Sequence, residues 1–220
     1  MCIVPLNYVI CGVDEAGKGS VLGPLVIAAV CGESYEIFKN RGYADSKRLS
    51  KSKRDELFTD IYSFFNVSII TLSASEIDEM RKETGMNSIV AAAHADAIQA
   101  LKPARAYVDA CDVNALRYGE TVAGNLSISC EIISEHKADS LHPVVSAASI
   151  IAKVTRDRMI CDLYDEYGNF GSGYPSDSKT IDFLDAYIRS NGNPPACARK
   201  SWKTVLAITE RVHQSTLSDF

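Results

Sequence analysis

Apolar residues along the chain fall into short runs that alternate with longer stretches of amphipathic pattern. The short runs predict strands over residues 8–13, 21–31, 67–72, 105–110 and 127–133. Apolar residues three or four apart predict helices over 87–101, 144–167, 179–189 and 199–212, with further helices beginning after residues 50 and 73. This alternation of strands and helices predicts an α/β fold.

Two serines mark predicted helix starts. Ser50 is placed to cap one helix, and Ser73 forms a capping-box pattern with Glu76 for the next. Gly85 separates that second helix from the alanine-rich helix over 87–101. The helix after Ser50 is expected to carry Leu57, Ile61, Phe64 and Phe65 on one face.

The connections between the predicted strands set their directions. Only a short loop joins the first two strands, which favours an antiparallel pair. The strand over 105–110 follows a helix, which favours parallel pairing with the first strand. Parallel strands end at the same edge of a sheet. Asp14 and Asp109, each near the end of an apolar strand, are therefore expected to meet at the carboxyl edge.

The loop after the first strand carries candidate chemistry. Asp14 and Glu15 are adjacent carboxylates whose charges disfavour each other in a partly desolvated site. Lys18 supplies one positive charge, and a hard divalent cation is the natural further partner. Gly17 and Gly19 lack a Cβ, so a ligand can approach their backbone closely. On spacing alone, a polar hairpin turn without a ligand remains an open alternative.

A phosphate-binding P-loop is the competing motif at the same place. Gly12, Gly17 and Lys18 have the required spacing, but Gly19 stands where a serine or threonine would hold the metal. The two neighbouring carboxylates would also face the phosphates. The sequence therefore argues against an NTP-binding loop.

Other polar residues lie on or near predicted helices. Asp139 comes just before the helix over 144–167, where a carboxylate can either ligate a metal or cap the helix. Asp112 is interpreted as a helix cap. His94, on the alanine-rich helix, is interpreted as a packing or surface residue.

Composition limits the classes of protein that fit. The 220 residues are 46% hydrophobic, enough for one domain or a domain with an appendage, and no apolar run reaches transmembrane length. Seven cysteines without a Cys-x-x-Cys pair are typical of reduced thiols, so a cytoplasmic protein is expected. The formal net charge of −5 argues against a protein that coats nucleic acid, but it does not exclude an enzyme with one basic groove.

Several separated motifs occur in order along the chain. They are Asp14-Glu15 with Gly17-Lys18-Gly19, Asp45-Ser46-Lys47, Asp109, the run from Ala138 to Val154 that contains Asp139, Gly171-Ser172-Gly173-Tyr174-Pro175-Ser176-Asp177, and Arg199 to Thr204. In this combination, over nearly its whole length, the sequence resembles ribonuclease HII, the type 2 ribonuclease H family, in its archaeal form.

The resemblance implies a ribonuclease H-like fold, a mixed five-stranded sheet flanked by helices, with a C-terminal helical extension. It implies a catalytic domain over 1–178 and a substrate-contacting extension over 179–220. The family's loop that senses a ribose 2′-hydroxyl corresponds to Gly17, Lys18 and Gly19, and its sugar-stacking tyrosine corresponds to Tyr174. Its four acidic ligands, for two Mg²⁺ or Mn²⁺ ions, correspond to Asp14, Glu15, Asp109 and Asp139.

The implied activity is metal-dependent hydrolysis of the RNA strand in RNA/DNA hybrids and incision 5′ of single ribonucleotides in duplex DNA, leaving 5′-phosphate and 3′-hydroxyl ends. Lys47, Lys153 and Lys203 are candidate phosphate contacts. Rival functions are another ribonuclease H-like nuclease, such as a junction resolvase, and a non-catalytic duplex-binding module. We expect a monomer without membrane contact whose C-terminal tail, residues 214–220, docks on a sliding clamp.

Two residues depart from the family's usual loop. Lys18 replaces an arginine, and because lysine lacks the planar fork of donors, reduced selectivity is expected. Ser20 stands where proline is frequent, which affects the shape of the loop rather than the activity.

Overall fold

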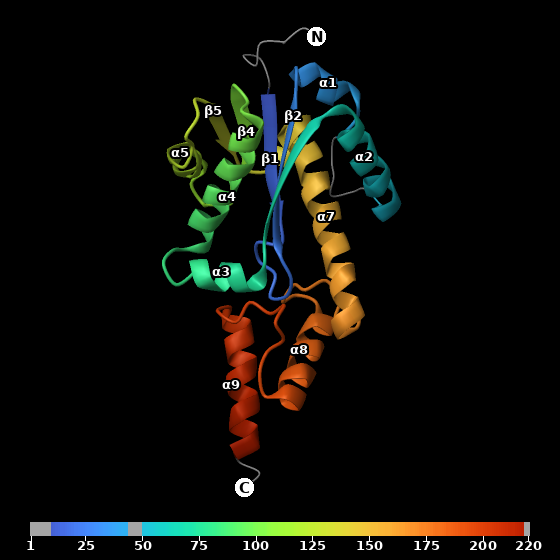
Figure 1. The fold of residues 1–220 in the computed structure, drawn as a ribbon, viewed down its shortest axis with the longest axis vertical. Helices are drawn as coiled ribbons and strands as arrows, with labels where there is room; N and C mark the ends of the chain where they lie inside the picture. The colour runs from blue at the N-terminus through green and yellow to red at the C-terminus, as the bar shows by residue number, and fades with distance from the viewer. Residues whose placement is uncertain (1–9, 44–49, 218–220) are drawn as a thin grey trace. The chain divides into compact units, whose positions relative to one another are not determined.

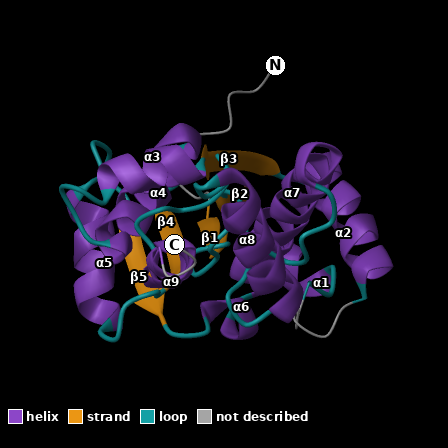
Figure 2. Ribbon diagram, turned by 90° about the horizontal axis from the view of Figure 1, so that it is seen from below, coloured by secondary structure: helices purple, strands orange, loops and turns teal. Residues whose placement is uncertain are grey.

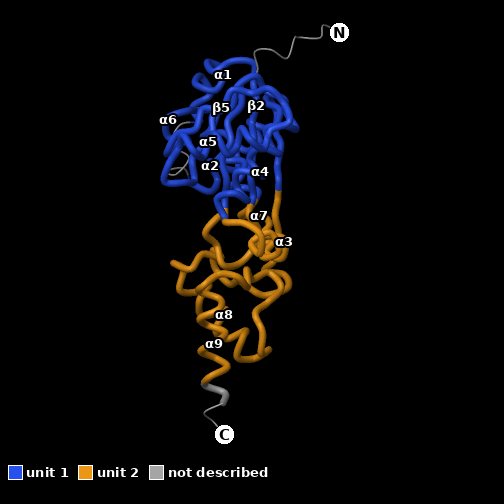
Figure 3. Tube along the Cα trace, turned by 90° about the vertical axis from the view of Figure 1, so that its left-hand side faces the viewer, with its two compact units in different colours: residues 1–16, 26–70, 86–155 blue, residues 17–25, 71–85, 156–220 orange. Residues whose placement is uncertain are grey.

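The computed structural model describes residues 10–43 and 50–217, with side chains described as far as residue 214. The Asp45-Ser46-Lys47 motif, and with it the candidate phosphate contact Lys47, lies outside the described residues. The chain divides into two compact units (Figure 3). The sheet unit comprises residues 1–16, 26–70 and 86–155, and the loop unit comprises residues 17–25, 71–85 and 156–220. The division at residue 178 implied by the family resemblance is a different one and stays a prediction.

A mixed five-stranded sheet organises the sheet unit (Figure 1). Its strands are β1 (Ile10–Ala16), β2 (Leu25–Gly32), β3 (Asn66–Leu72), β4 (Arg105–Asp109) and β5 (Glu131–Glu135). They lie in the order β3-β2-β1-β4-β5. β1 pairs antiparallel with β2 and parallel with β4, and β4 pairs parallel with β5. The predicted fold class and the predicted directions of β1, β2 and β4 are confirmed.

The helices follow the predicted pattern closely. They are α1 (Tyr35–Asn40), α2 (Lys51–Phe64), α3 (Ala74–Met80), α4 (Met86–Leu101), α5 (Ala115–Gly124), α6 (Ala138–Leu141), α7 (Pro143–Tyr167), α8 (Ser178–Asn191) and α9 (Lys203–Leu217). The predicted capping box of Ser73 and Glu76 opens α3, and the Ser50 hydroxyl accepts from Lys53 N–H at the start of α2. Both predicted caps are confirmed.

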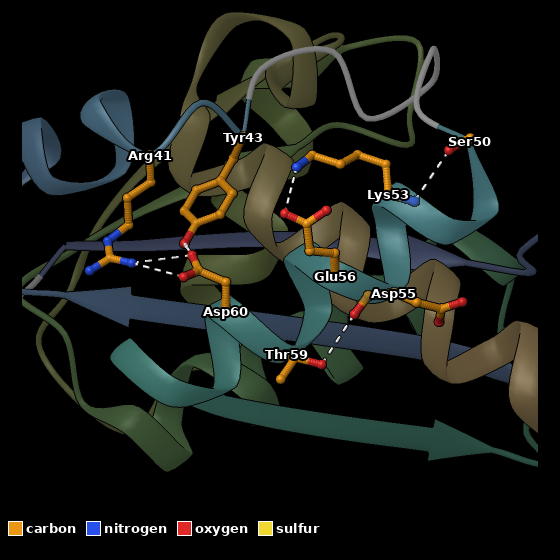
Figure 4. A network of polar contacts seen from close by, with 8 residues as sticks. All are labelled: Arg41, Tyr43, Ser50, Lys53, Asp55, Glu56, Thr59 and Asp60. Carbon is orange, nitrogen blue, oxygen red and sulfur yellow. Dashed lines mark hydrogen bonds and ion pairs between the residues drawn. The ribbon is translucent and has the colours of Figure 1, made fainter.

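Polar contacts hold α2 to the segment before it (Figure 4). The Arg41 guanidinium donates to Asp60 Oδ1 at 3.0 Å, and the Tyr43 hydroxyl donates to the same carboxylate. Leu57 and Ile61 are buried. Phe64 is 60% exposed with the Arg41 guanidinium over its ring. Phe64, predicted to share a face with Leu57 and Ile61, therefore does not share their burial, and its ring packs against a cation.

Some other sequence-based assignments are also corrected. The fifth strand lies over 131–135 rather than 127–133. α1 and α5 were not predicted. Asp112 does not cap α5. Asn114 is its N-cap residue, and Asp112 instead accepts a hydrogen bond from the Asn114 N–H at 3.0 Å. α1 and α5 are short, and α5 exposes Leu116, so neither has a long apolar stripe.

Helices cover both faces of the sheet (Figure 2). α4 contacts β1 and α5 contacts β5, while the beginning of α7 lies against the opposite face. A Cβ on Gly12 of β1 would lie 2.2 Å from the carbonyl oxygen of Val144 in α7. The absence of a side chain at Gly12 therefore lets α7 approach the strand that carries Asp14.

The loop unit has its own apolar core. α8 contributes Leu184 and Ile188 to this core, and α9 contributes Val205 and Ile208. Phe170 and, from the segment that follows β1, Val21 and Leu22 complete it. Among the described residues, no helix combines the length and the apolar character needed to span a bilayer. The cytoplasmic location stays a prediction.

Candidate active site

Two carboxylates lie at the carboxyl ends of adjacent parallel strands. β1 and β4 pair in register as far as Val13 with Val108, and Asp14 and Asp109 are the next residues on the two strands. Asp14 is only 5% exposed, and Asp109 is half-buried. The predicted parallel pairing therefore brings these two carboxylates together.

The negative charges around Asp14 indicate that the carboxylates need a further positive charge beside them. Burial, with the negative charges of Glu15 and Asp109, raises the pKa of Asp14 well above its usual range. A hydrogen bond from Ser149 and the positive charge of Lys153, both on α7, act in the opposite direction without cancelling the rise. A further cation beside Asp14 would relieve the remaining repulsion.

Asp109 also contacts the segment that carries Asp139. Its Oδ1 accepts a hydrogen bond from the backbone N–H of Ala138, at 2.9 Å. Ala138 begins α6, and the following residue, Asp139, is 4% exposed. Asp139 therefore lies within the first turn of α6, while α7 begins at Pro143. The alternative that Asp139 caps the long helix is wrong.

Glu15 lies on the opposite face of β1 from Asp14, because successive side chains alternate along a strand. Its Oε2 is 3.2 Å from Nε2 of His94 on α4. Both atoms are buried, and neither has a hydrogen-bond partner among the described residues. Nδ1 of His94 is 3.2 Å from the Tyr118 hydroxyl of α5. The interpretation of His94 as a packing or surface residue is therefore incomplete, since this fully buried imidazole contacts a candidate ligand.

The donor set fits divalent cations that prefer oxygen ligands. The four candidate carboxylates all belong to the sheet unit. In the described part of the chain, no three acidic, histidine or cysteine side chains converge on a single point that could hold a metal ion. Mg²⁺ commonly takes one or two carboxylates together with water and phosphate oxygens. These residues therefore fit ions whose coordination is completed by substrate and water.

The predicted 2′-hydroxyl sensor lies in the loop unit. Gly17 has a φ of +90°, and its N–H donates to the Tyr174 hydroxyl at 3.0 Å. The Ser20 hydroxyl donates to the Gly17 carbonyl at 2.9 Å and so closes the loop. Lys18 is half-buried and Gly19 is exposed. The structure thus joins the loop to Tyr174, two features far apart in the sequence.

The predicted phosphate contacts differ in their surroundings. Lys153, near Asp14, donates to Ser149 Oγ at 2.6 Å. Lys203 is the exposed first residue of α9. Lys153 belongs to the sheet unit and Lys203 to the loop unit.

Sequence reasoning did not single out two buried arginines. Arg156 is 3% exposed and Arg199 is fully buried, both in the loop unit. Arginine is usually a surface residue, so nothing in the sequence pattern indicates this burial. The contact of His94 with Glu15 is not predicted for a similar reason, since it depends on how α4 packs against β1.

Comparisons with known proteins agree with this geometry. The family model described as Ribonuclease HII matches residues 11–205. Ribonuclease HII of Methanoregula boonei is 57% identical over 211 residues, which cover 96% of this chain and 99% of that protein. These matches span the segments that hold the four carboxylates and both loops.

Solved structures show the same fold. The ribonuclease H2 of Pyrococcus horikoshii OT3 matches with a TM-score of 0.87 and 39% identity, over 94% of this chain and 99% of that one. The structure of the PCNA:RNase HII complex from Archaeoglobus fulgidus matches with a TM-score of 0.83 and 40% identity, over 89% and 95% of the two chains. The chain therefore belongs to the ribonuclease HII family of endoribonucleases.

Proposed function

We propose that the chain hydrolyses the RNA strand of RNA/DNA hybrids and incises duplex DNA on the 5′ side of single embedded ribonucleotides, leaving 5′-phosphate and 3′-hydroxyl ends. The observation that carries the proposal is the meeting of Asp14 and Asp109 at the ends of parallel strands. The backbone N–H of Ala138, the residue before Asp139, donates to Asp109. Membership of the ribonuclease HII family supports it.

Ribonuclease H enzymes depend on divalent metal ions. Two Mg²⁺ or Mn²⁺ ions are assigned to the sheet unit, where Asp14, Glu15, Asp109 and Asp139 would hold them. When bound, the ions would activate the attacking water and stabilise the leaving 3′-oxygen. Lys153 already offsets part of the negative charge around Asp14. Nε2 of His94 lies 3.2 Å from Oε2 of Glu15 on the far face of β1.

Discrimination between RNA and DNA is assigned to the loop unit. The 2′-hydroxyl is the chemical group by which a protein distinguishes the two at a given nucleotide. Gly17, Lys18 and Gly19 would contact this hydroxyl, and the ring of Tyr174 would stack on the neighbouring sugar. The hydrogen bond between Gly17 N–H and the Tyr174 hydroxyl supports a shared role for the two segments. Lys47, Lys153 and Lys203 are proposed to contact phosphates.

The test is cleavage of a labelled DNA duplex with one internal ribonucleotide, beside an all-DNA duplex and a long RNA/DNA hybrid. Incision 5′ of the ribonucleotide, only with Mg²⁺ or Mn²⁺, is expected. Cleavage of all-DNA four-way junctions would favour a junction resolvase instead. Metal-independent binding without any cleavage would show a duplex-binding module.

We also propose that residues 214–220 bind a sliding clamp and that the enzyme is otherwise a monomer. The related structure from Archaeoglobus fulgidus is a complex with PCNA. This tail ends in an aromatic residue, Phe220. Phe220→Ala should weaken binding to a purified archaeal clamp, measured by calorimetry, and leave cleavage of short duplexes unchanged. Equal clamp affinity of the variant and the parent chain would contradict this assignment.

A further inference from the structure

Two buried arginines lie beneath the loop that contains Gly17, Lys18 and Gly19. Arg156, on α7, and Arg199, before α9, both belong to the loop unit. A buried guanidinium is costly unless its donors are hydrogen-bonded. In the described residues, neither arginine has a carboxylate within ion-pair distance. Their partners must therefore be sought among uncharged groups.

Those partners are backbone carbonyls of the loop. Arg199 donates from Nη1 to the Lys18 carbonyl at 2.9 Å, and from Nε and Nη2 to the Gly23 carbonyl, each at 3.2 Å. Arg199 thus connects Lys18, in the loop, to Gly23, two residues before the return strand β2. A planar guanidinium fixes two such acceptors at set angles, which a lysine ammonium cannot do.

Arg156 joins the same loop to Tyr174. Its Nη2 donates to the Leu22 carbonyl at 3.4 Å and to the Ser172 carbonyl at 3.2 Å. Its guanidinium carbon lies 4.7 Å from the centre of the Tyr174 ring. A Cβ on Gly17 would lie 2.4 Å from Arg156 Nε. Arg156 therefore contacts both halves of the proposed ribose-reading site and makes a glycine necessary at position 17.

An outer layer supports Arg199 in turn. The Trp202 ring lies 4.9 Å from the Arg199 guanidinium and 4.6 Å from that of Arg81. On α3, Asp78 accepts from the backbone N–H groups of Lys200 and Ser201, at 2.7 and 3.0 Å. The segment that follows Arg199 is therefore held to α3 by hydrogen bonds and packs on Arg199 through Trp202.

We propose that Arg156 and Arg199 are positioning residues that assemble the Gly17–Gly19 loop and Tyr174 into one rigid site for reading a single ribonucleotide. The proposal rests on the proposed function. A long hybrid has a 2′-hydroxyl on every nucleotide of its RNA strand, so a loosened loop can still contact one of them in many binding positions. A duplex with one ribonucleotide has a single 2′-hydroxyl, so only one binding position is productive. Weakening either arginine should therefore reduce activity on the second substrate far more than on the first.

The experiment compares Arg199→Lys and Arg156→Lys with the parent enzyme on both substrates in Mg²⁺. Arg189→Lys on α8, where the arginine is exposed and paired with Asp185, is the matched control. A misplaced contact group commonly costs about 100-fold in rate. We expect kcat/KM on the single-ribonucleotide duplex to fall about 10- to 100-fold, with a change of less than about threefold on the long hybrid. The control should match the parent on both.

A second measurement reports the loop directly. Hydrogen exchange of peptides covering residues 17–24 should accelerate in both lysine variants, while peptides covering β1 exchange as in the parent. If one lysine variant does not fold, the same measurements on the other carry the test, together with Trp202→Ala, which removes the ring that packs on the Arg199 guanidinium.

The outcomes separate the two proposals. If the parent enzyme cuts neither substrate, the proposed function fails. If the parent cuts both and each variant loses the same factor on both, or loses nothing, the positioning role of the arginines is overturned and the proposed function stands.

Discussion

Nε2 of His94 lies 3.2 Å from Oε2 of Glu15, with both atoms buried between β1 and α4. The contact ties one oxygen of a proposed metal ligand to a helix on the far side of the sheet. Groups that orient metal ligands typically change metal affinity or activity by 10- to 100-fold when removed.

His94→Ala should therefore lower cleavage about 10- to 100-fold and raise the Mg²⁺ concentration needed for half-maximal activity. His94→Gln, whose amide can still donate toward Glu15, should recover part of the loss. His213→Ala, at an exposed histidine on α9, is the control. An unchanged Mg²⁺ titration for His94→Ala would show that the Glu15 contact has no part in metal binding.

Asp109→Asn should abolish cleavage, with a loss of more than about 100-fold, because a direct ligand matters more than the groups around it. The amide oxygen can still accept from the Ala138 N–H, so the fold should persist. Removing one negative charge near Asp14 should also leave the metal-free Tm equal or higher, since Asp109 contributes to the raised pKa of Asp14. Calorimetry in EDTA and single-turnover cleavage measure the two effects. A metal-free Tm well below that of the parent, or residual full activity, would contradict the assignment.

Gly12→Ala should destabilise the sheet unit. The new methyl group would meet the Val144 carbonyl at 2.2 Å and push α7 away from β1. Overpacking of this kind costs about 1–3 kcal/mol, a decrease in Tm of roughly 2–12 °C. Gly124→Ala at the end of α5 is the control, because nothing lies within 4 Å of a Cβ there. Equal Tm values for the two variants would show that the close approach is not needed.

Asp112 should contribute stability that disappears in acid. Hydrogen bonds from the Asn114 N–H, Asn87 and Arg117 lower the pKa of Asp112 to about 2. A carboxylate with a lowered pKa stabilises the folded state above its unfolded pKa of about 3.9 and loses that effect as the pH falls toward 2. The Tm of the parent should therefore exceed that of Asp112→Asn at pH 6, and the difference should shrink between about pH 4 and pH 2. A difference independent of pH would exclude the charge as its source.

The sequence predicts those features of the fold that depend on a local pattern of residue types. The capping box at Ser73 and the direction of β4 follow from residue types and connection lengths, and both are confirmed. The exposure of Phe64 was not predicted because its ring packs on Arg41, a contact that apolar periodicity does not encode. The four carboxylates could be proposed from motif order.

The partners of those carboxylates could not be predicted in the same way. His94 reaches Glu15 across 79 positions of sequence, and Arg199 reaches Lys18 across 181. Such contacts depend on packing between distant segments. Burial of an arginine or a histidine also runs against the usual preference of those residues, so no local signal marks it.

Arg156 and Arg199 hold their loop through carbonyl dipoles, which neither titrate nor attract counter-ions. Burial and the nearby charge of Arg156 lower the pKa of Arg199 to about 9, so this guanidinium remains charged near neutral pH. Attraction between exposed lysines and phosphates, in contrast, weakens as salt rises. Ionic strength can therefore tune how tightly the enzyme holds a duplex without altering which nucleotide it selects.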